Sequence, residues 1–186
     1  MARTLILLAH PNLKRSRANR LIKDQLLNIP ETVLVDLYEE HPYFYIPVAK
    51  YKALLKDCDH VVVQCPLYWY SVPALLKLWF DEVLELDFAY GTGGDALKGK
   101  SFFLSMTVGG DKEAYCSEGD NRLPLSEYLK PLKQTALICN MNWLEPCVLF
   151  GAGLCSDPEL LEHAQRVQTL VRDLTLNGYQ RTEVQP

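Results

Sequence analysis

The sequence predicts an α/β fold: a doubly wound, five-stranded parallel sheet in the order 2-1-3-4-5, with helices on both of its faces. Three observations lead to this prediction. Short apolar runs alternate along the chain with segments whose apolar residues recur at helical spacing. The runs are apolar throughout, which is typical of strands buried on both faces. The 186 residues, 48% of them hydrophobic, show no repeat or linker, so residues 1–186 are expected to form one domain.

The expected elements follow one another in a regular alternation. Strands are predicted at Thr4–His10, Thr32–Leu37, His60–Cys65, Ser101–Val108 and Trp143–Phe150. Helices are predicted at Ser16–Asn28, at Val48–Cys58, from about Val72, around Leu125–Thr135 and at Asp157–Asn177. Pro73 is expected in the first turn of its helix, where a missing N–H costs nothing. Asp157 is expected to cap the last helix.

The composition makes several classes of partner and site unexpected. The chain has 19 basic and 23 acidic residues without a basic run, so neither nucleic acid nor an anionic membrane is an expected partner. Six cysteines lack C-x-x-C pairing and complete no zinc spacing with the four histidines, so we expect them to be mostly reduced core thiols, and we expect no metal. The run Leu5–Ala9 is too short for a signal peptide, and prolines break the uncharged stretch Val61–Leu76. A soluble, cytoplasmic protein with a small-molecule or protein partner is expected.

In a sheet of this order, ligands bind at the carboxyl ends of the strands, where the strand order reverses. The first loop there offers Ser16 at a helix start, where its hydroxyl and the N–H groups of residues 17–19 can hold a phosphate. A plain N-cap role for Ser16 fits equally well. His10, at the end of the first strand, is either a phosphate donor or a hydrogen-bonded core histidine.

Two further loops meet at the same edge. Tyr68, Trp69 and Tyr70 follow the third strand and could form an aromatic wall that stacks a flat ring; alternatively, Trp69 packs under the next helix. Gly109 and Gly110 follow the fourth strand and let the main chain approach a ligand closely, although they also suit a bare turn. Phosphate, ring and close backbone approach together indicate a flavin nucleotide.

Several stretches resemble a known family in unbroken order from Leu5 to about Gly153. They are "AHP", "SRANR", "PLYWYSVPALLKLWFDEVL", "FAYGTGGDALKGK", "TVGG" and "LKPLKQTALICNMNWLEP". Together they resemble the flavodoxin-like NAD(P)H:quinone oxidoreductases. The pattern at Asn121–Leu132 is most similar to the ancillary flavoproteins of glutathione-gated potassium efflux systems. The resemblance implies a flavodoxin-like fold, a homodimer, bound FMN or alternatively FAD, and NAD(P)H as co-substrate.

The resemblance also implies roles for particular residues. The expected flavin contacts are His10, Ser16, Arg17, Ala18 and Asn19 at the phosphate; Leu67, Tyr68, Trp69 and Tyr70 along the ring; and Thr107, Val108, Gly109 and Gly110 at its pyrimidine edge. The implied mechanism is ping-pong: NAD(P)H gives hydride to the flavin and leaves, and a quinone then takes two electrons in the same pocket.

The chain departs from the family at one catalytic position. Animal quinone reductases have a tyrosine and, six residues later, a histidine that stabilise the reduced flavin; here Tyr115 matches the first and Asn121 replaces the second. Asparagine donates hydrogen bonds but cannot become a cation. Tyr115 and Asn121 are the residues expected to be catalytic, with Tyr115 the better candidate, although a rim role for Tyr115 fits as well.

Two functions therefore remain open. The first is a flavin-dependent NAD(P)H oxidoreductase that acts on quinones or similar electrophiles. The alternative, which Asn121 favours, is a regulatory flavoprotein that docks on a potassium efflux system at the inner face of the cell membrane, activates it and has only weak catalysis.

Overall fold

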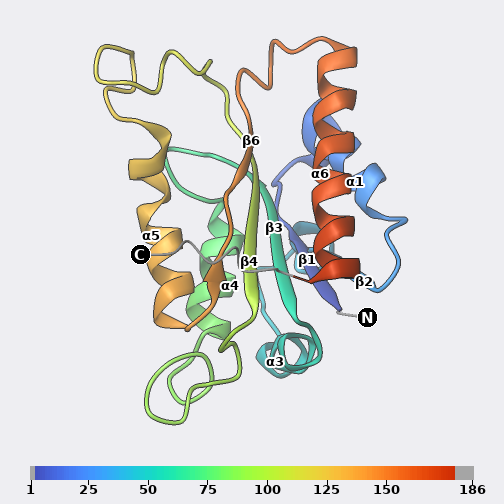
Figure 1. Ribbon diagram of the computed structural model, residues 1–186, viewed down its shortest axis with the longest axis vertical. Helices are drawn as coiled ribbons and strands as arrows, with labels where there is room; N and C mark the ends of the chain where they lie inside the picture. The colour runs from blue at the N-terminus through green and yellow to red at the C-terminus, as the bar shows by residue number, and fades with distance from the viewer. Residues whose placement is uncertain (1–2, 179–186) are drawn as a thin grey trace.

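The computed structural model describes residues 3–178 and is built on a parallel sheet in the order β2-β1-β3-β4-β5, with β6 also paired to β4 (Figure 1). The strands are β1 (Thr4–Leu8), β2 (Thr32–Asp36), β3 (His60–Pro66), β4 (Ser101–Thr107), β5 (Asn142–Trp143) and β6 (Cys147–Leu149). Every residue of β1, β3 and β4 is buried, as continuous apolar runs predict. The predicted doubly wound order is confirmed.

Helices cover both faces of this sheet (Figure 1). They are the short 3₁₀ turn η1 (Leu13–Arg15), α1 (Arg17–Leu26), α2 (Leu37–Glu40), α3 (Val48–Asp57), α4 (Ala74–Val83), α5 (Leu125–Ile138) and α6 (Asp157–Asn177). Side chains of β1 alternate between the two layers: Leu5 and Leu7 join the core under α3, α4 and α5, whereas Ile6 joins the core under α1 and α6. Because α1 follows β1 through the η1 turn, the start of α1 lies at the carboxyl end of β1.

The fifth strand is not the continuous segment predicted at Trp143–Phe150. β5 pairs with the first residues of β4, and β6 pairs with its last residues. Pro146 lies between the two short strands. Because proline has no N–H to donate to a strand ladder, it interrupts the pairing at this point.

Three helix starts also differ from expectation. Ser156, not Asp157, is the N-cap of α6, and its N–H donates to Glu159 Oε2 at 2.8 Å. Pro73 stands directly before α4 and outside its first turn. The unexpected α2 begins because Asp36 Oδ1 accepts the N–H of Glu39 at 3.3 Å.

Cys116 is exposed and Cys155 is half-buried. All six cysteines are free thiols, and the other four are buried: Cys58, Cys65, Cys139 and Cys147. They act as small apolar residues of the core. Over residues 3–178, no helix combines the length and the apolar character needed to span a bilayer.

Candidate functional site

A pocket of about 390 Å³ opens at the carboxyl ends of β1, β3 and β4. Its lining consists of His10, Arg15, Ser16, Arg17, Ala18, Asn19, Pro66, Leu67, Tyr68, Thr107, Val108, Gly109, Ala152 and Gly153. The pocket brings together all the residues expected to contact a flavin except Trp69, Tyr70 and Gly110. The sequence did not lead us to expect Arg15, Pro66, Ala152 or Gly153 at the flavin site.

His10 forms one wall of this pocket and is 8% exposed. Its Nδ1 accepts the N–H of Asn12 at 3.1 Å, so the neutral ring carries its proton on Nε2 and donates it to the Tyr68 hydroxyl at 3.2 Å. Burial lowers the pKa of His10, an effect larger than the opposing one of Asp36. His10 is therefore a hydrogen-bonded, neutral histidine that also lines the pocket and orients Tyr68.

Ser16 is the N-cap of α1. Its Oγ accepts the main-chain N–H of Asn19 at 3.2 Å and the Nδ2 of the same side chain at 3.1 Å. Because the hydroxyl only accepts in both contacts, its own proton stays available to a ligand. The N–H groups at the start of α1 have no acceptor within the helix, so this end of α1 is suited to an anion.

The Asn19 side chain is committed to the protein itself. It is 2% exposed, and its Nδ2 also donates to Thr107 Oγ1 at 3.0 Å. Its Oδ1 accepts from Gln64 Nε2 at 2.8 Å. The side chain therefore ties the start of α1 to β3 and β4 and fixes the floor of the pocket.

The turn between β3 and α4 has an unusual backbone. Tyr68 and Ser71 exchange main-chain hydrogen bonds at 2.9 and 3.0 Å across two left-handed residues, Trp69 (φ 48°) and Tyr70 (φ 62°). Such turns favour Asn and Gly, and bulky residues there are strained. Trp69 is 92% exposed, so it neither lines the pocket nor packs under α4.

Tyr70 belongs to a tyrosine cluster beside the pocket. Its hydroxyl donates to Asn121 Oδ1 at 3.1 Å, and its ring stacks on Tyr128 with 4.7 Å between centroids. The Tyr128 hydroxyl donates to the Asn121 carbonyl at 2.6 Å. Tyr70 also lines a second hollow, of about 360 Å³, which lies between α4 and α5 and shares Leu67 with the first pocket.

The two residues expected to be catalytic lie together at Gly110. A Cβ on this glycine would stand 3.2 Å from the Tyr115 ring and 3.5 Å from Asn121 Nδ2. Burial raises the pKa of Tyr115, and the neighbouring Tyr70 and Tyr128 raise it further. Tyr115 therefore keeps its proton at neutral pH and can donate a hydrogen bond.

Comparison with known proteins agrees with this architecture. Residues 2–171 match the family model Flavodoxin_2, described by its flavodoxin-like fold. The chain belongs to this family. The predicted flavodoxin-like fold is thereby confirmed, and the pocket lies at the strand edge where ligands bind in sheets of this order.

Three similar proteins are informative. The glutathione-regulated potassium-efflux system ancillary protein KefG of Cronobacter sakazakii is 41% identical over 179 residues, which is 96% of this chain and 97% of that protein. The uncharacterized NAD(P)H oxidoreductase YdeQ of Bacillus subtilis is 38% identical, over 94% of this chain and 89% of its own. The structure of general stress protein 14 of Treponema denticola in complex with FMN has a TM-score of 0.88 and 32% identity, over 92% of this chain and 99% of that one. The name of the B. subtilis protein matches the expected oxidoreductase class, and the name KefG matches the alternative, a flavoprotein that acts on a potassium efflux system.

Proposed function

We propose that the protein is an FMN-dependent NAD(P)H oxidoreductase that reduces quinones or similar electrophiles by a ping-pong mechanism. The observation that carries the proposal is the pocket at the ends of β1, β3 and β4, which gathers the donors suited to a phosphate beside Leu67 and Tyr68. The oxidoreductase name of the B. subtilis relative and the FMN in the T. denticola structure support it. The quinone acceptor rests on the resemblance of the motifs.

The residues present fit FMN. The Ser16 hydroxyl and the N–H groups of Arg17 and Ala18 would hold its phosphate, and Leu67 and Tyr68 would lie along its ring. A Cβ added at Gly109 would meet no atom within 4 Å, so the main chain there faces open space that a ligand can fill. When bound, FMN supplies the hydride-accepting and two-electron chemistry.

The chain's own residues would position the reactants and balance charge. His10 holds Tyr68 through a hydrogen bond, which limits the movement of a ring-contacting side chain. The Tyr115 ring and the Asn121 amide lie beside Gly110. We propose the Tyr115 O–H and the Asn121 NH₂ group as the donors for the negative charge that develops at the pyrimidine edge. Because Tyr70 occupies Asn121 Oδ1, the Asn121 NH₂ group is oriented as a donor.

A spectroscopic experiment tests the proposal. Purified protein is loaded with FMN, freed of oxygen and mixed with NADPH or NADH. The oxidised-flavin absorption band should bleach and return when a quinone is added. Double-reciprocal plots of the initial rate against NAD(P)H concentration, at several fixed quinone concentrations, should give parallel lines. Bound FMN that neither nicotinamide reduces would contradict the enzyme proposal.

A second function is favoured by a specific observation. The similarity to KefG extends over nearly the whole of both chains, and Asn121 replaces a histidine that supports catalysis in the resembling family. In this function the protein docks on a potassium efflux protein at the inner face of the membrane and activates it. Co-purification with such a transporter and faster potassium efflux on its addition are the expected results, even with the oxidoreductase-impaired Tyr115→Phe variant.

Both proposals include a homodimer, which the family resemblance implies. Sedimentation of the FMN-loaded protein measures its mass directly. A mass of twice the 21.2 kDa chain is expected, and a monomer at all concentrations would contradict it.

A further inference from the structure

A phosphate bound at the start of α1 would attract a nearby cation, and the sequence points first to Arg17. In the structure, however, Arg17 Nη2 donates to Asp157 Oδ1 at 2.5 Å and joins the start of α1 to the start of α6. An exposed ion pair of this kind is weak, but drawing Arg17 to a phosphate would leave Asp157 without its partner. The ion pair with Asp157 therefore competes with phosphate binding by Arg17.

The other basic groups near the pocket are also engaged or placed elsewhere. His10 is neutral, because its Nδ1 accepts a main-chain N–H and burial lowers its pKa. Lys14 and Arg20 line a different hollow, between the β1–α1 loop and α2. Lys23 is paired with two carboxylates, those of Asp36 and Glu39.

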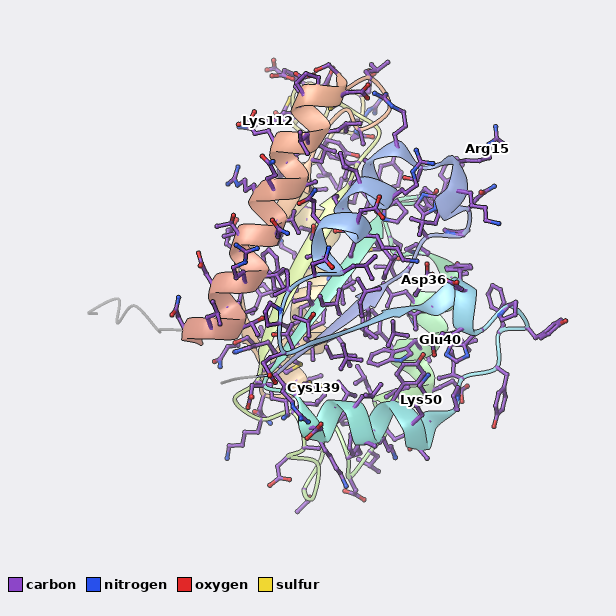
Figure 2. All side chains as sticks on the ribbon, turned by 90° about the vertical axis from the view of Figure 1, so that its right-hand side faces the viewer. Arg15, Asp36, Glu40, Lys50, Lys112 and Cys139 are labelled. Atoms are coloured by element: carbon purple, nitrogen blue, oxygen red, sulfur yellow. The ribbon has the colours of Figure 1, made fainter. Side chains whose placement is uncertain are left out.

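Arg15 is the remaining cation of the pocket lining. It is exposed, and no carboxylate lies within 4.0 Å of it among residues 3–178. The η1 turn fixes its main chain, since Arg15 N–H donates to Asn12 O at 3.1 Å and Ser16 N–H to Leu13 O at 3.0 Å. Figure 2 shows Arg15 at the edge of the molecule, on the loop that precedes α1.

We propose that Arg15 is the side chain that neutralises the phosphate of the bound flavin, while Arg17 secures α1 to α6. This inference rests on the proposed function. A phosphate monoester carries about −1.5 to −2 charges at neutral pH, and neutral N–H and O–H donors do not balance them. A guanidinium does so with two parallel hydrogen bonds, and Arg15 gives up no other partner to make them.

The test compares two flavins that differ only in the phosphate. Dissociation constants for FMN and riboflavin are measured by quenching of flavin fluorescence in the full chain, in Arg15→Gln and in the control Lys14→Gln. Lys14 lies next to Arg15 on the same turn but lines the other hollow. We expect Arg15→Gln to weaken FMN about tenfold and leave riboflavin unchanged, whereas Lys14→Gln should change either by less than about twofold.

Arg17→Gln completes the comparison, with a smaller loss of FMN affinity expected than for Arg15→Gln. The inference is overturned if Arg15→Gln matches Lys14→Gln, if it weakens riboflavin as much as FMN, or if Arg17→Gln has the larger effect. Wild-type protein that binds neither flavin would overturn the proposed function itself. Binding of FMN to the wild type together with an unchanged Arg15→Gln variant overturns the inference alone.

Discussion

At the scale of single residues, Asn121 decides how well the site can stabilise charge. Its Oδ1 accepts from Tyr70 and its NH₂ group faces Gly110, so it can donate hydrogen bonds but supplies no positive charge. We expect Asn121→His to speed quinone reduction about tenfold near pH 6, because an imidazolium stabilises the developing negative charge. The gain should fade as pH rises through about 6.5, where histidine loses its proton.

The measurement is turnover with NADPH and a quinone at several pH values. Tyr70→Phe is the matched control, because it removes the hydrogen bond to Asn121 without adding a charge. It should show no gain at any pH. A rate for Asn121→His that is the same at pH 6 and pH 8 would mean that residue 121 does not act on the developing charge.

Tyr115 is either a catalytic donor or a tyrosine of the pocket rim. If it donates to the developing charge, Tyr115→Phe should lower turnover about tenfold and leave the dissociation constant of FMN unchanged. Because its pKa is raised, the wild-type rate should not fall at the ordinary pKa of tyrosine, about 10. A variant that turns over like the wild type would assign Tyr115 to the rim.

At the scale of elements, the turn between β3 and α4 has a strained backbone and exposes the Trp69 side chain. Trp69 adopts φ 48° while making almost no contact with the protein, so its strain is not offset by packing. Trp69→Asn should raise the free energy of unfolding by about 0.5–1 kcal/mol, since asparagine tolerates this conformation. The same change should weaken FMN binding if the ring of Trp69 covers the bound flavin.

Urea unfolding and FMN titration measure the two effects separately. Glu31 is a suitable control: it is exposed, has φ 57° and stands before β2, remote from the pocket lining. Glu31→Asn should stabilise the fold and leave FMN affinity unchanged. Trp69→Asn protein that is stabilised but binds FMN like the wild type would place Trp69 outside the flavin site.

The elements also show what the sequence could and could not predict. β1, β3 and β4 were predictable because each is a continuous apolar run, and Ser16 was predictable as a helix start. The split of the fifth strand depends on Pro146. The left-handed turn at Trp69 and Tyr70 could not be predicted, because the sequence has no Gly or Asn at these two positions. In the site, Ala152 and Gly153 carry no chemical signal, and only the fold brings their loop to the pocket.

At the scale of the whole molecule, we expect buried histidines to make the free energy of unfolding depend on pH. His60, at the start of β3, is 5% exposed, and neither of its ring nitrogens has a partner among residues 3–178. Burial lowers its pKa; Asp59 raises the pKa and Lys100 lowers it, both by less. His163 on α6 is similar: burial lowers its pKa, and Arg166 lowers it further.

The direction of the pH effect follows from these shifts. The unfolded chain takes up protons on these histidines at about pH 6.5, whereas the folded chain takes them up only at lower pH. Below about pH 6.5 the unfolded state therefore binds more protons, and the free energy of unfolding should be smaller at pH 5.5 than at pH 7.5. Most carboxylates stay ionised in this window, because their ordinary pKa values lie near 4.

Urea unfolding of wild type, His60→Leu and His163→Leu at both pH values tests this origin. Each variant removes a buried group that would otherwise have to lose its proton on folding, so each should reduce the difference between the two pH values. His60→Leu should also match or exceed wild-type stability at pH 7.5, because the buried imidazole has no hydrogen-bond partner to lose. If both variants keep the full wild-type difference between the two pH values, the acid sensitivity does not arise from His60 or His163. Burial also lowers the pKa values of the hydrogen-bonded His10 and His41, so these two would be tested next.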